Sequence, residues 1–207
     1  MARLATLAGE LEAAAAEFRV VRWWPQGEAG LKLVYLHGPP AAGKYSIALG
    51  LQEEAGLLNF HSHLTLDVAK SLFDFGTPAF WDLTNELRQV SLRAIAQDPD
   101  AAVVFTSCYS HPHDHAGVLA IERVAVESGG EFLPVFLECG VDELRRRVGN
   151  PARVAMKKLT SVTALDEFLE TWNIVPLDHA RCVTIRTEGR RSADCVDEVI
   201  ERLGLNK

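Results

Sequence analysis

The stretch LKLVYLHGPPAAGKYS, residues 31–46, contains the motif that decides the fold. An apolar run leads into Gly38, then four residues, then Gly43 and Lys44. The run has the leucine and valine content of a buried parallel strand, and the residues after Lys44 favour a helix that ends near Gly56. Strand, loop and helix in this order are the setting of a phosphate-binding loop, in which backbone N–H groups and a lysine surround phosphate oxygens.

The loop therefore predicts a site for the phosphates of a nucleotide. The residues expected to bind them are Gly38, Ala41, Ala42, Gly43, Lys44, Tyr45 and Ser46. Lys44 is also expected to act in catalysis, because such a lysine reaches the outer phosphates. In the alternative interpretation, the two glycines only serve a tight turn.

One position departs from the usual motif. The residue after the lysine is normally serine or threonine, whose hydroxyl binds the magnesium ion that accompanies the nucleotide, but here it is Tyr45. Ser46 comes one residue later, about 100° further round a helix. Ser46 remains the candidate metal ligand, and Mg²⁺ is expected to depend also on other groups or on water.

The composition predicts a single core and small anionic ligands. The chain has 207 residues, of which 48% are apolar, and a formal net charge of −7. That charge makes nucleic acid an unexpected partner. Four scattered cysteines without a CxxC pair fit reduced thiols in the cytoplasm. No apolar run has membrane-spanning length, and Glu10 and Glu12 interrupt the apolar start of the chain, so a signal peptide is not expected.

Beyond the loop, apolar runs alternate with helical patterns. Strands are expected near residues 31–36, 57–60, 102–106, 132–137 and 182–185. Helices are expected near residues 77–95, 116–127, 141–148, 161–172 and 193–203. This alternation predicts an α/β fold with a parallel sheet. Residues 1–30, with a helix at about 5–17, are expected to form an extension to the main domain at 31–207.

The helix expected at 77–95 begins with the favourable pair Thr77 and Pro78. The residues expected to face the core are Phe80, Leu83, Leu87, Val90 and Ile95. Arg88 would then lie among the polar positions, where it is a candidate for binding an anionic group of a substrate.

Polar side chains follow the second expected strand. Ligands in open α/β sheets bind at the carboxyl ends of strands, so His61, His63 and Asp67 are expected to line an acceptor site beside the loop. Asp67 or a neutral His63 has the chemistry to orient or deprotonate an attacking hydroxyl group. The alternatives are a helix N-terminal acid for Asp67 and a zinc pair, without a third ligand, for the histidines.

The third expected strand is followed by SHPHDH, residues 110–115. Three histidines and an aspartate suggest a metal site, but Asp114 is well placed as the N-cap of the next helix, so a loop bordering the pocket is expected. A plain capped turn is the alternative. This strand also lacks the acidic residue that usually supports magnesium in P-loop proteins.

A basic segment at about 145–160 follows the fourth strand and its helix. Arginines that close over a transferring phosphoryl group neutralise its charge and exclude water. Arg147 and Arg153 are therefore candidate catalytic residues of a mobile lid, which also contains Lys157 and Lys158. The alternative is a solvated, charged helix end.

The chain resembles small-molecule kinases of the P-loop superfamily, the group of shikimate, gluconate and adenylate kinases, and bacterial proteins labelled shikimate-kinase-like or AAA-family ATPases. The resemblance covers about residues 31–203 and rests on LHGPPAAGKYSIA, NFHSHLTLD, FWDLTNELR, VVFTSCY and ELRRRVGNPARVAMKKLT. It implies a five-stranded parallel sheet in the order 2-3-1-4-5, a lid, and packing of the nucleotide base near residues 187–192. Shikimate kinases carry an aspartate pair where this chain has His61 and His63, so shikimate itself is not the expected substrate.

The expected activity is transfer of the γ-phosphoryl group of ATP, with Mg²⁺, to a hydroxyl group of a small molecule. One alternative is a nucleoside or nucleotide kinase, in which Trp81 would stack on a base because the periodicity places Phe80 in the core. Another is a regulator that binds ATP and hydrolyses it poorly, which Tyr45 and the missing acid both permit. A homodimer is compatible with the leading helix.

Overall fold

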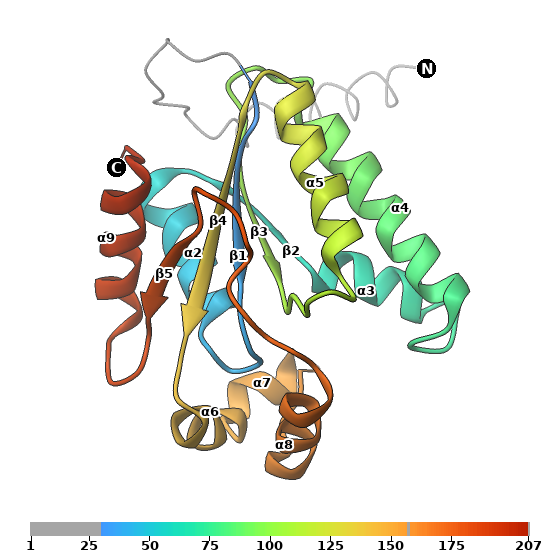
Figure 1. The fold of residues 1–207 in the computed structure, drawn as a ribbon, viewed down its shortest axis with the longest axis vertical. Helices are drawn as coiled ribbons and strands as arrows, with labels where there is room; N and C mark the ends of the chain where they lie inside the picture. Colours follow the sequence, from blue (N-terminus) through green and yellow to red (C-terminus); the bar gives the residue numbers. More distant parts are fainter. Residues whose placement is uncertain (1–29, 157, 207) are drawn as a thin grey trace, which may run out of the picture.

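The computed structural model describes residues 30–156 and 158–206, and its centre is a five-stranded sheet (Figure 1). The strands are β1 (Lys32–His37), β2 (Leu58–His61), β3 (Ala102–Ser107), β4 (Glu131–Glu138) and β5 (Val183–Arg186). They lie in the order β2-β3-β1-β4-β5, and all neighbouring strands are parallel. This confirms the predicted α/β fold and strand order.

Helices cover both faces of the sheet (Figure 1). The covering helices are α2 (Lys44–Ala55) and α9 (Ser192–Leu203) on one face, and α4 (Pro78–Ile95) and α5 (His115–Glu127) on the other. Alternate residues of a strand point to opposite faces, so β1 contributes to two separate cores. Val34 and Leu36 pack in the core that includes α2 and α9, whereas Leu33 and Tyr35 pack in the core that includes α4 and α5.

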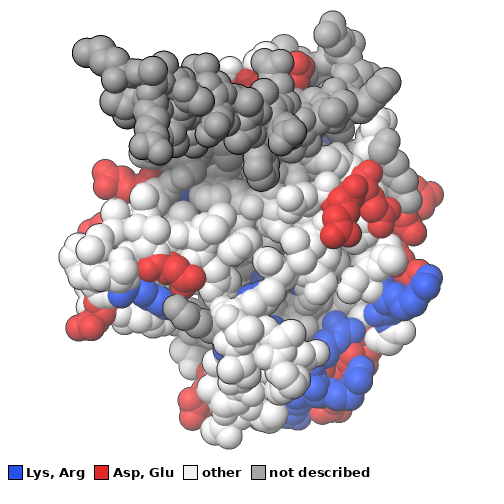
Figure 2. All heavy atoms as spheres, turned by 180° about the vertical axis from the view of Figure 1, so that it is seen from behind, with Lys and Arg blue, Asp and Glu red and all other residues white. Residues whose placement is uncertain are grey.

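The remaining helices lie around the carboxyl ends of the strands (Figure 1). They are α3 (His63–Lys70), α6 (Val141–Val148), α7 (Pro151–Ala155) and α8 (Val162–Thr171). Because the loop after β1 opens at the same edge, these helices surround the predicted phosphate site. In Figure 2, lysine and arginine side chains gather mainly at this end of the molecule, with acidic side chains among them.

Most helix boundaries follow the expected capping residues. The Thr77 hydroxyl accepts a hydrogen bond from the Phe80 N–H at the start of α4, and Gly56 ends α2 in the left-handed conformation with φ 67°. Two helices were not expected. α3 has small buried residues, Thr65 and Ala69, and α7 is only five residues long, so neither shows a clear apolar period.

The expected core face of α4 was partly wrong. Its buried residues are Phe80, Thr84 and Leu92, while Val90 is 62% exposed. Arg88 lies four residues from both Thr84 and Leu92, so it belongs to the buried stripe and not to the polar face. Thr84 tolerates burial because its hydroxyl donates a hydrogen bond to the Phe80 carbonyl oxygen at 2.7 Å.

Two expectations lie outside the described residues: the leading helix at about 5–17 and the lid residue Lys157. Across residues 30–156 and 158–206, no helix has the length and apolar character that crossing a membrane requires. The four cysteines carry free thiols.

Candidate active site

The loop after β1 is shaped by positive backbone angles. φ is 140° at Gly38, 67° at Ala41 and 102° at Gly43. A Cβ atom on Gly38 would lie 2.6 Å from the Leu137 carbonyl oxygen, so the close approach of β4 requires glycine there. α2 begins directly after Gly43, and its first N–H groups therefore face the loop without intrahelical partners. This is the geometry of an anion cradle.

Lys44 lies inside this cradle. Its ammonium donates hydrogen bonds to the carbonyl oxygens of Gly38 and Pro39, both at 2.7 Å. No carboxylate pairs with it within the described residues. The charge of Lys44 is thus held by the loop itself, in the place where phosphate oxygens would compete for it.

Tyr45 connects the loop to the neighbouring elements. Its ring meets the ring of His61 edge to face, with the centroids 5.3 Å apart. The Lys158 ammonium lies 4.1 Å from the centroid of the same ring. The tyrosine that replaces the usual hydroxyl residue therefore contacts both the end of β2 and the segment that joins α7 to α8.

His61 and His63 lie side by side, with ring centroids 6.3 Å apart. The Nδ1 atoms of both rings are buried and have no hydrogen-bond partner. Burial and then the charge of Lys158 lower the pKa of both, that of His63 to about 4, although Asp67 opposes the shift. Both rings are consequently neutral at pH 7, and a neutral imidazole can accept a proton.

Asp67 is the fifth residue of α3, one turn after His63, and its side chain is exposed. It therefore lies on the same side of the helix as His63. The alternative that Asp67 is a helix N-terminal acid is wrong, because α3 begins four residues earlier.

The loop after β3 borders this region, as expected, but its contacts differ from those of a capped turn. The Asp114 carboxylate occupies the N-cap position of α5 without capping the helix, and instead accepts a hydrogen bond from the Ser110 N–H at 2.8 Å. The Tyr109 hydroxyl bonds the Nδ1 atoms of His111 and His115, at 2.9 and 3.2 Å. These side chains brace the loop.

Few side chains near the loop could bind a magnesium ion. β3 ends at Ser107 and is followed by Cys108, not by a carboxylate, and Ser46 is exposed on α2. Within the described residues, no group of three histidine, cysteine, aspartate or glutamate side chains could hold a metal ion. These donors do not fit a magnesium ion held by the protein, and they do not support the zinc alternative at the histidines.

Arg88 reaches the same edge of the sheet from α4. Its guanidinium lies 5.5 Å from the centroid of the Phe105 ring, and its buried Nε–H has no partner. Its Nη1 donates a weak hydrogen bond to the Asn85 amide oxygen at 3.3 Å. Burial lowers the pKa of Arg88, although the neighbouring Tyr35 and Asp114 oppose the shift. A buried cation with an unused donor is suited to an anionic ligand.

The two expected lid arginines have different partners. Arg147 donates to the Glu143 carboxylate at 2.5 Å and to the Thr187 carbonyl oxygen at 2.6 Å, so it ties α6 to the loop after β5. Arg147 therefore has partners within the fold, and its expected place over the phosphates stays a prediction. Arg153 on α7 donates only its Nε–H, to the Leu159 carbonyl oxygen at 3.0 Å, within the described contacts. Burial lowers the pKa of Arg153, and the Cys108 thiol opposes this.

Two residues at the site were missed as functional candidates. Lys158 was noted only as part of the lid. His37 ends β1, is fully buried, and has an Nδ1 atom without a partner. Burial and then the charge of Lys44 lower the pKa of His37 to about 3. In the sequence, His37 could have been recognised as a site residue by its position at the end of a buried strand, one residue before Gly38.

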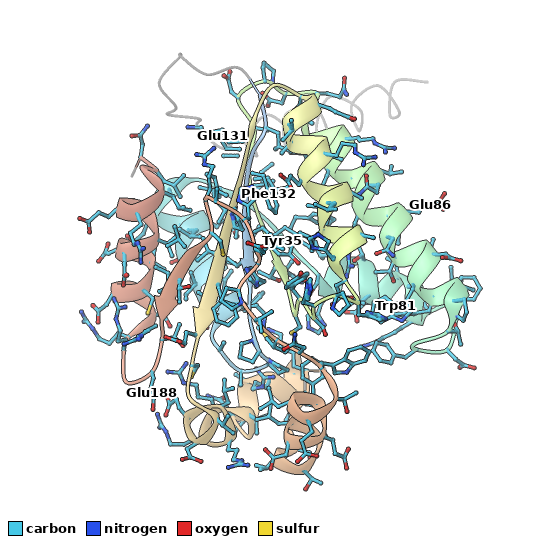
Figure 3. The ribbon with its side chains drawn as sticks, in the orientation of Figure 1. Tyr35, Trp81, Glu86, Glu131, Phe132 and Glu188 are labelled. Atoms are coloured by element: carbon cyan, nitrogen blue, oxygen red, sulfur yellow. The ribbon has the colours of Figure 1, made fainter. Side chains whose placement is uncertain are left out.

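Aromatic side chains extend the site toward α4. Figure 3 shows Tyr35 within the fold beneath α5 and Trp81 at the first turn of α4, near α3. Phe80 is fully buried, as predicted, and Trp81 packs edge to face against it with centroids 4.9 Å apart. Trp81 is half-buried, so part of its ring remains open to a ligand at this edge.

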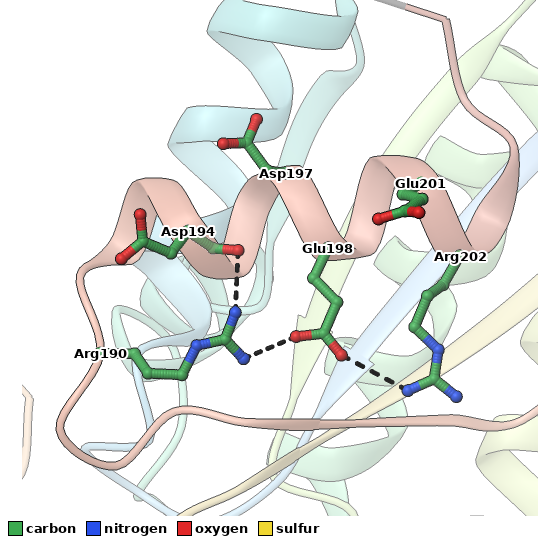
Figure 4. A pocket seen from close by; sticks show the side chains of 6 residues that line it. All are labelled: Arg190, Asp194, Asp197, Glu198, Glu201 and Arg202. Atoms are coloured by element: carbon green, nitrogen blue, oxygen red, sulfur yellow. Dashed lines mark hydrogen bonds and ion pairs between the residues drawn. The ribbon is translucent and has the colours of Figure 1, made fainter.

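A depression on the outer face of α9 lies apart from these residues (Figure 4). There Arg190 pairs with Glu198 at 2.6 Å, and Glu198 also lies 3.5 Å from Arg202. These ion pairs satisfy one another, so the depression is explained as a charged helix surface.

Comparison with solved structures identifies the fold. A gluconokinase from Sinorhizobium meliloti matches with a TM-score of 0.59 and 15% identity, over 84% of this chain and 91% of its own. The fold is that of the P-loop small-molecule kinases. The APS kinase of Mycobacterium tuberculosis, solved with AMPPNP and APS, matches with a TM-score of 0.57 and 17% identity, over 86% of this chain and 99% of its own.

A tunicamycin resistance protein from Deinococcus radiodurans is also similar, with a TM-score of 0.58 and 14% identity over 84% of this chain and 96% of its own. The sequence matches no protein-family model and no curated protein. At these identities the comparisons establish the fold, and the chemistry has to be argued from the residues of this chain.

Proposed function

We propose that the protein transfers the γ-phosphoryl group of ATP to a hydroxyl group of a small anionic molecule in the cytoplasm. One observation carries this proposal: the Tyr45 ring at the start of α2 contacts His61 at the end of β2, with centroids 5.3 Å apart. The phosphate cradle and a pair of neutral histidines therefore adjoin each other. A donor site beside a proton acceptor is the arrangement that phosphoryl transfer needs.

The donor side would act through the loop and Lys44. Backbone N–H groups of Gly38 and of Ala41 to Ser46 would bind the β- and γ-phosphates. Lys44 would leave its two carbonyl partners to contact the oxygens between these phosphates. Arg153 would neutralise charge from the side of α7. Arg147 would instead position α6 against the residues 187–192, where the nucleotide base is expected to pack.

The acceptor side would supply a base and an anchor. The acceptor oxygen would form a bond to the γ-phosphorus while the bond from that phosphorus to the bridging oxygen breaks, and ADP would leave with the electron pair. The hydroxyl proton would move to one of the two histidines, with His63 as the favoured base because Asp67 lies one turn away from it on α3. Arg88 would bind an anionic group on the acceptor.

Ser46 is the loop hydroxyl that could contact Mg²⁺, and the nucleotide's own oxygens and water would have to supply most of the other ligands. Mg²⁺ keeps several waters when it binds proteins through substrate phosphates, so such binding needs few protein ligands. The described donors do not provide more than that.

The test is ATP consumption with a panel of acceptors. Wild-type protein is mixed with ATP and alcohols, sugars, aminoglycosides and nucleosides, each with and without a carboxylate or phosphate group, and ADP is measured. Stimulation by an anionic hydroxy compound supports the proposal. ATP binding without stimulation by any class would favour a regulator instead.

A nucleoside or nucleotide kinase is the second candidate, and Trp81 favours it. The half-buried Trp81 ring packs against Phe75 and Phe80 and could stack on a base. Stimulation by nucleosides that is lost in Trp81→Leu, while sugar acids have no effect, would decide for this candidate.

A further inference from the structure

Lys158 differs from the other cations near the loop in its partner. Its ammonium lies over the Tyr45 ring at 4.1 Å, and no ion pair or side-chain hydrogen bond involves it within the described residues. Tyr45 occupies the position at which the usual loop supplies a metal-binding hydroxyl. A protein cation is thus held by the residue that replaces a magnesium ligand.

Lys158 lies between the donor and acceptor sides of the site. Its charge lowers the pKa of both His61 and His63, which are on the acceptor side. Its own pKa is lowered to about 8, by burial and then by the charges of Arg153 and Lys44 on the donor side, with the Cys108 thiol opposing. The titratable and charged groups that face it are Lys44 and Tyr45 on α2, His61 on β2, His63 on α3, Cys108 after β3 and Arg153 on α7.

Three cations therefore gather here without a carboxylate paired to any of them in the described part of the chain. Like charges at close range destabilise one another, and more so where burial reduces solvent screening. A ligand with several negative charges would relieve this repulsion. A triphosphate has that charge, and the cradle beside Lys44 has the matching shape.

On the basis of the proposed kinase activity, we propose that Lys158 is a catalytic cation that takes over charge neutralisation from a protein-held magnesium ion, and that Tyr45 positions it. The ammonium would contact γ-phosphoryl oxygens as the group passes from the Lys44 side to the His63 side. A lysine on a flexible stem is a mobile point charge, and an aromatic face fixes it without neutralising it. Tyr45 is therefore a positioning residue and not a lost metal ligand.

The first consequence concerns metal dependence. Calorimetric titration with ATP in EDTA and in excess Mg²⁺ should give wild-type dissociation constants within about threefold of each other, because protein cations supply most of the charge. Lys158→Met should weaken binding in EDTA by about tenfold or more. Tyr45→Leu should weaken it similarly, whereas Tyr45→Phe, which keeps the ring, should stay within about twofold.

Lys70→Met is the matched control. Lys70 also lies over an aromatic ring, 5.2 Å from the centroid of Phe75, but it is exposed at the end of α3 and is not among the charges that act on Lys158. If the effect of Lys158 depends on its position beside the loop, Lys70→Met should change the affinity for ATP in EDTA by less than about twofold. Circular dichroism of each variant checks that the fold is kept.

The second consequence is proton uptake. At pH 8 the Lys158 ammonium is about half protonated, and a bound anion would raise its pKa, so ATP binding should take up about half a proton. Titrations at pH 8 in two buffers with different ionisation heats measure this number. Lys158→Arg keeps the charge but does not titrate there, so it should bind ATP and lose the uptake.

The outcomes separate the two proposals. If wild-type protein binds no ATP, the proposed kinase function fails. If wild-type binds and turns over ATP, but Lys158→Met and Tyr45→Leu keep wild-type affinity in EDTA and Lys158→Arg keeps the proton uptake, the role of Lys158 is overturned. The role of Lys158 is supported if Lys158→Met and Tyr45→Leu bind ATP more weakly in EDTA while Lys158→Arg retains binding.

Discussion

The donor and acceptor sides of the site are built in different ways. The donor side is a single stretch, Gly38 to Ser46, in which backbone angles and backbone N–H groups make the cradle. The acceptor side collects His61, His63 and Arg88 from separate elements, with Lys158 between the two sides, and their side chains make the site. A cradle made of backbone is set by local sequence, whereas a pocket made of side chains depends on how the elements pack.

The difference has a chemical meaning. Every nucleotide presents the same phosphates, so one backbone cradle serves any acceptor. The acceptor side decides what is phosphorylated, and it can change by single substitutions on α3 or α4 without disturbing the loop. The two sides should therefore fail in different ways when they are mutated.

Removal of the donor cation should have the largest effect. Lys44→Ala should lower kcat/KM for ATP by about 10³-fold, because no other residue of the loop supplies a charge inside the cradle. The measurement is initial-rate kinetics with the acceptor that the panel identifies. A loss of less than tenfold would contradict the assignment of the loop as the donor site.

A change to the donor backbone should damage the fold itself. Gly38→Ala should lower the free energy of unfolding by about 3 kcal/mol, because the added Cβ meets the Leu137 carbonyl oxygen at 2.6 Å and φ is 140°. Gly56→Ala is the control, with φ 67° but open space around the Cβ, and should cost about 1 kcal/mol. Urea denaturation measures both, and equal costs would show that β4 does not constrain the loop.

A change to the acceptor base should affect catalysis and spare stability. His63→Gln should lower kcat by about 10²-fold while leaving the urea midpoint near its wild-type value. Because the pKa of His63 is about 4, the wild-type rate should hold as the pH falls from 7 to about 5 and decline only below that. A decline centred near pH 6.5 that disappears in His63→Gln would show that the ring titrates normally.

His37 lies at the carboxyl end of β1, directly before the loop, and it should affect the stability of the fold. Its pKa is about 3 in the fold and about 6.5 when unfolded, so the unfolded state binds the proton first and stability falls as the pH drops. This group alone should cost about 2 kcal/mol between pH 7 and pH 5. Urea denaturation at both pH values should show a smaller loss for His37→Leu, and an equal loss would remove His37 from the explanation.

The smallest expected effect is on acceptor binding. Arg88→Gln should raise the KM for an anionic acceptor by about tenfold and leave the KM for ATP unchanged. The control is a neutral analogue of the acceptor, without its carboxylate or phosphate, and its KM should be the same for Arg88→Gln and for the wild type. An equal rise in both KM values would mean that Arg88 supports the fold and does not bind the acceptor.

The same contrast explains what could be predicted from sequence. The strands and the loop residues were predicted because glycine, lysine and apolar periods act locally, whereas the strand order was implied by the resemblance to P-loop kinases. Arg88 was placed on the wrong face of α4, because its burial depends on packing against Phe105 of strand β3, which is distant in sequence. Arg147 was given a role over the phosphates, because nothing in its own segment reveals its contact with Thr187, 40 residues later. Lys158 was passed over for the same reason, since its partner Tyr45 lies on α2.

The central claim is that backbone N–H groups of Gly38 and of residues 41 to 46 bind the phosphates of a nucleotide. Amide hydrogen exchange with and without ATP, followed by mass spectrometry of peptides that cover this loop, tests it most directly. The account predicts that ATP slows exchange in the loop and at the start of α2, and that Lys44→Ala largely abolishes the effect. Binding of ATP that leaves exchange in this loop unchanged, or no binding at all, would contradict it.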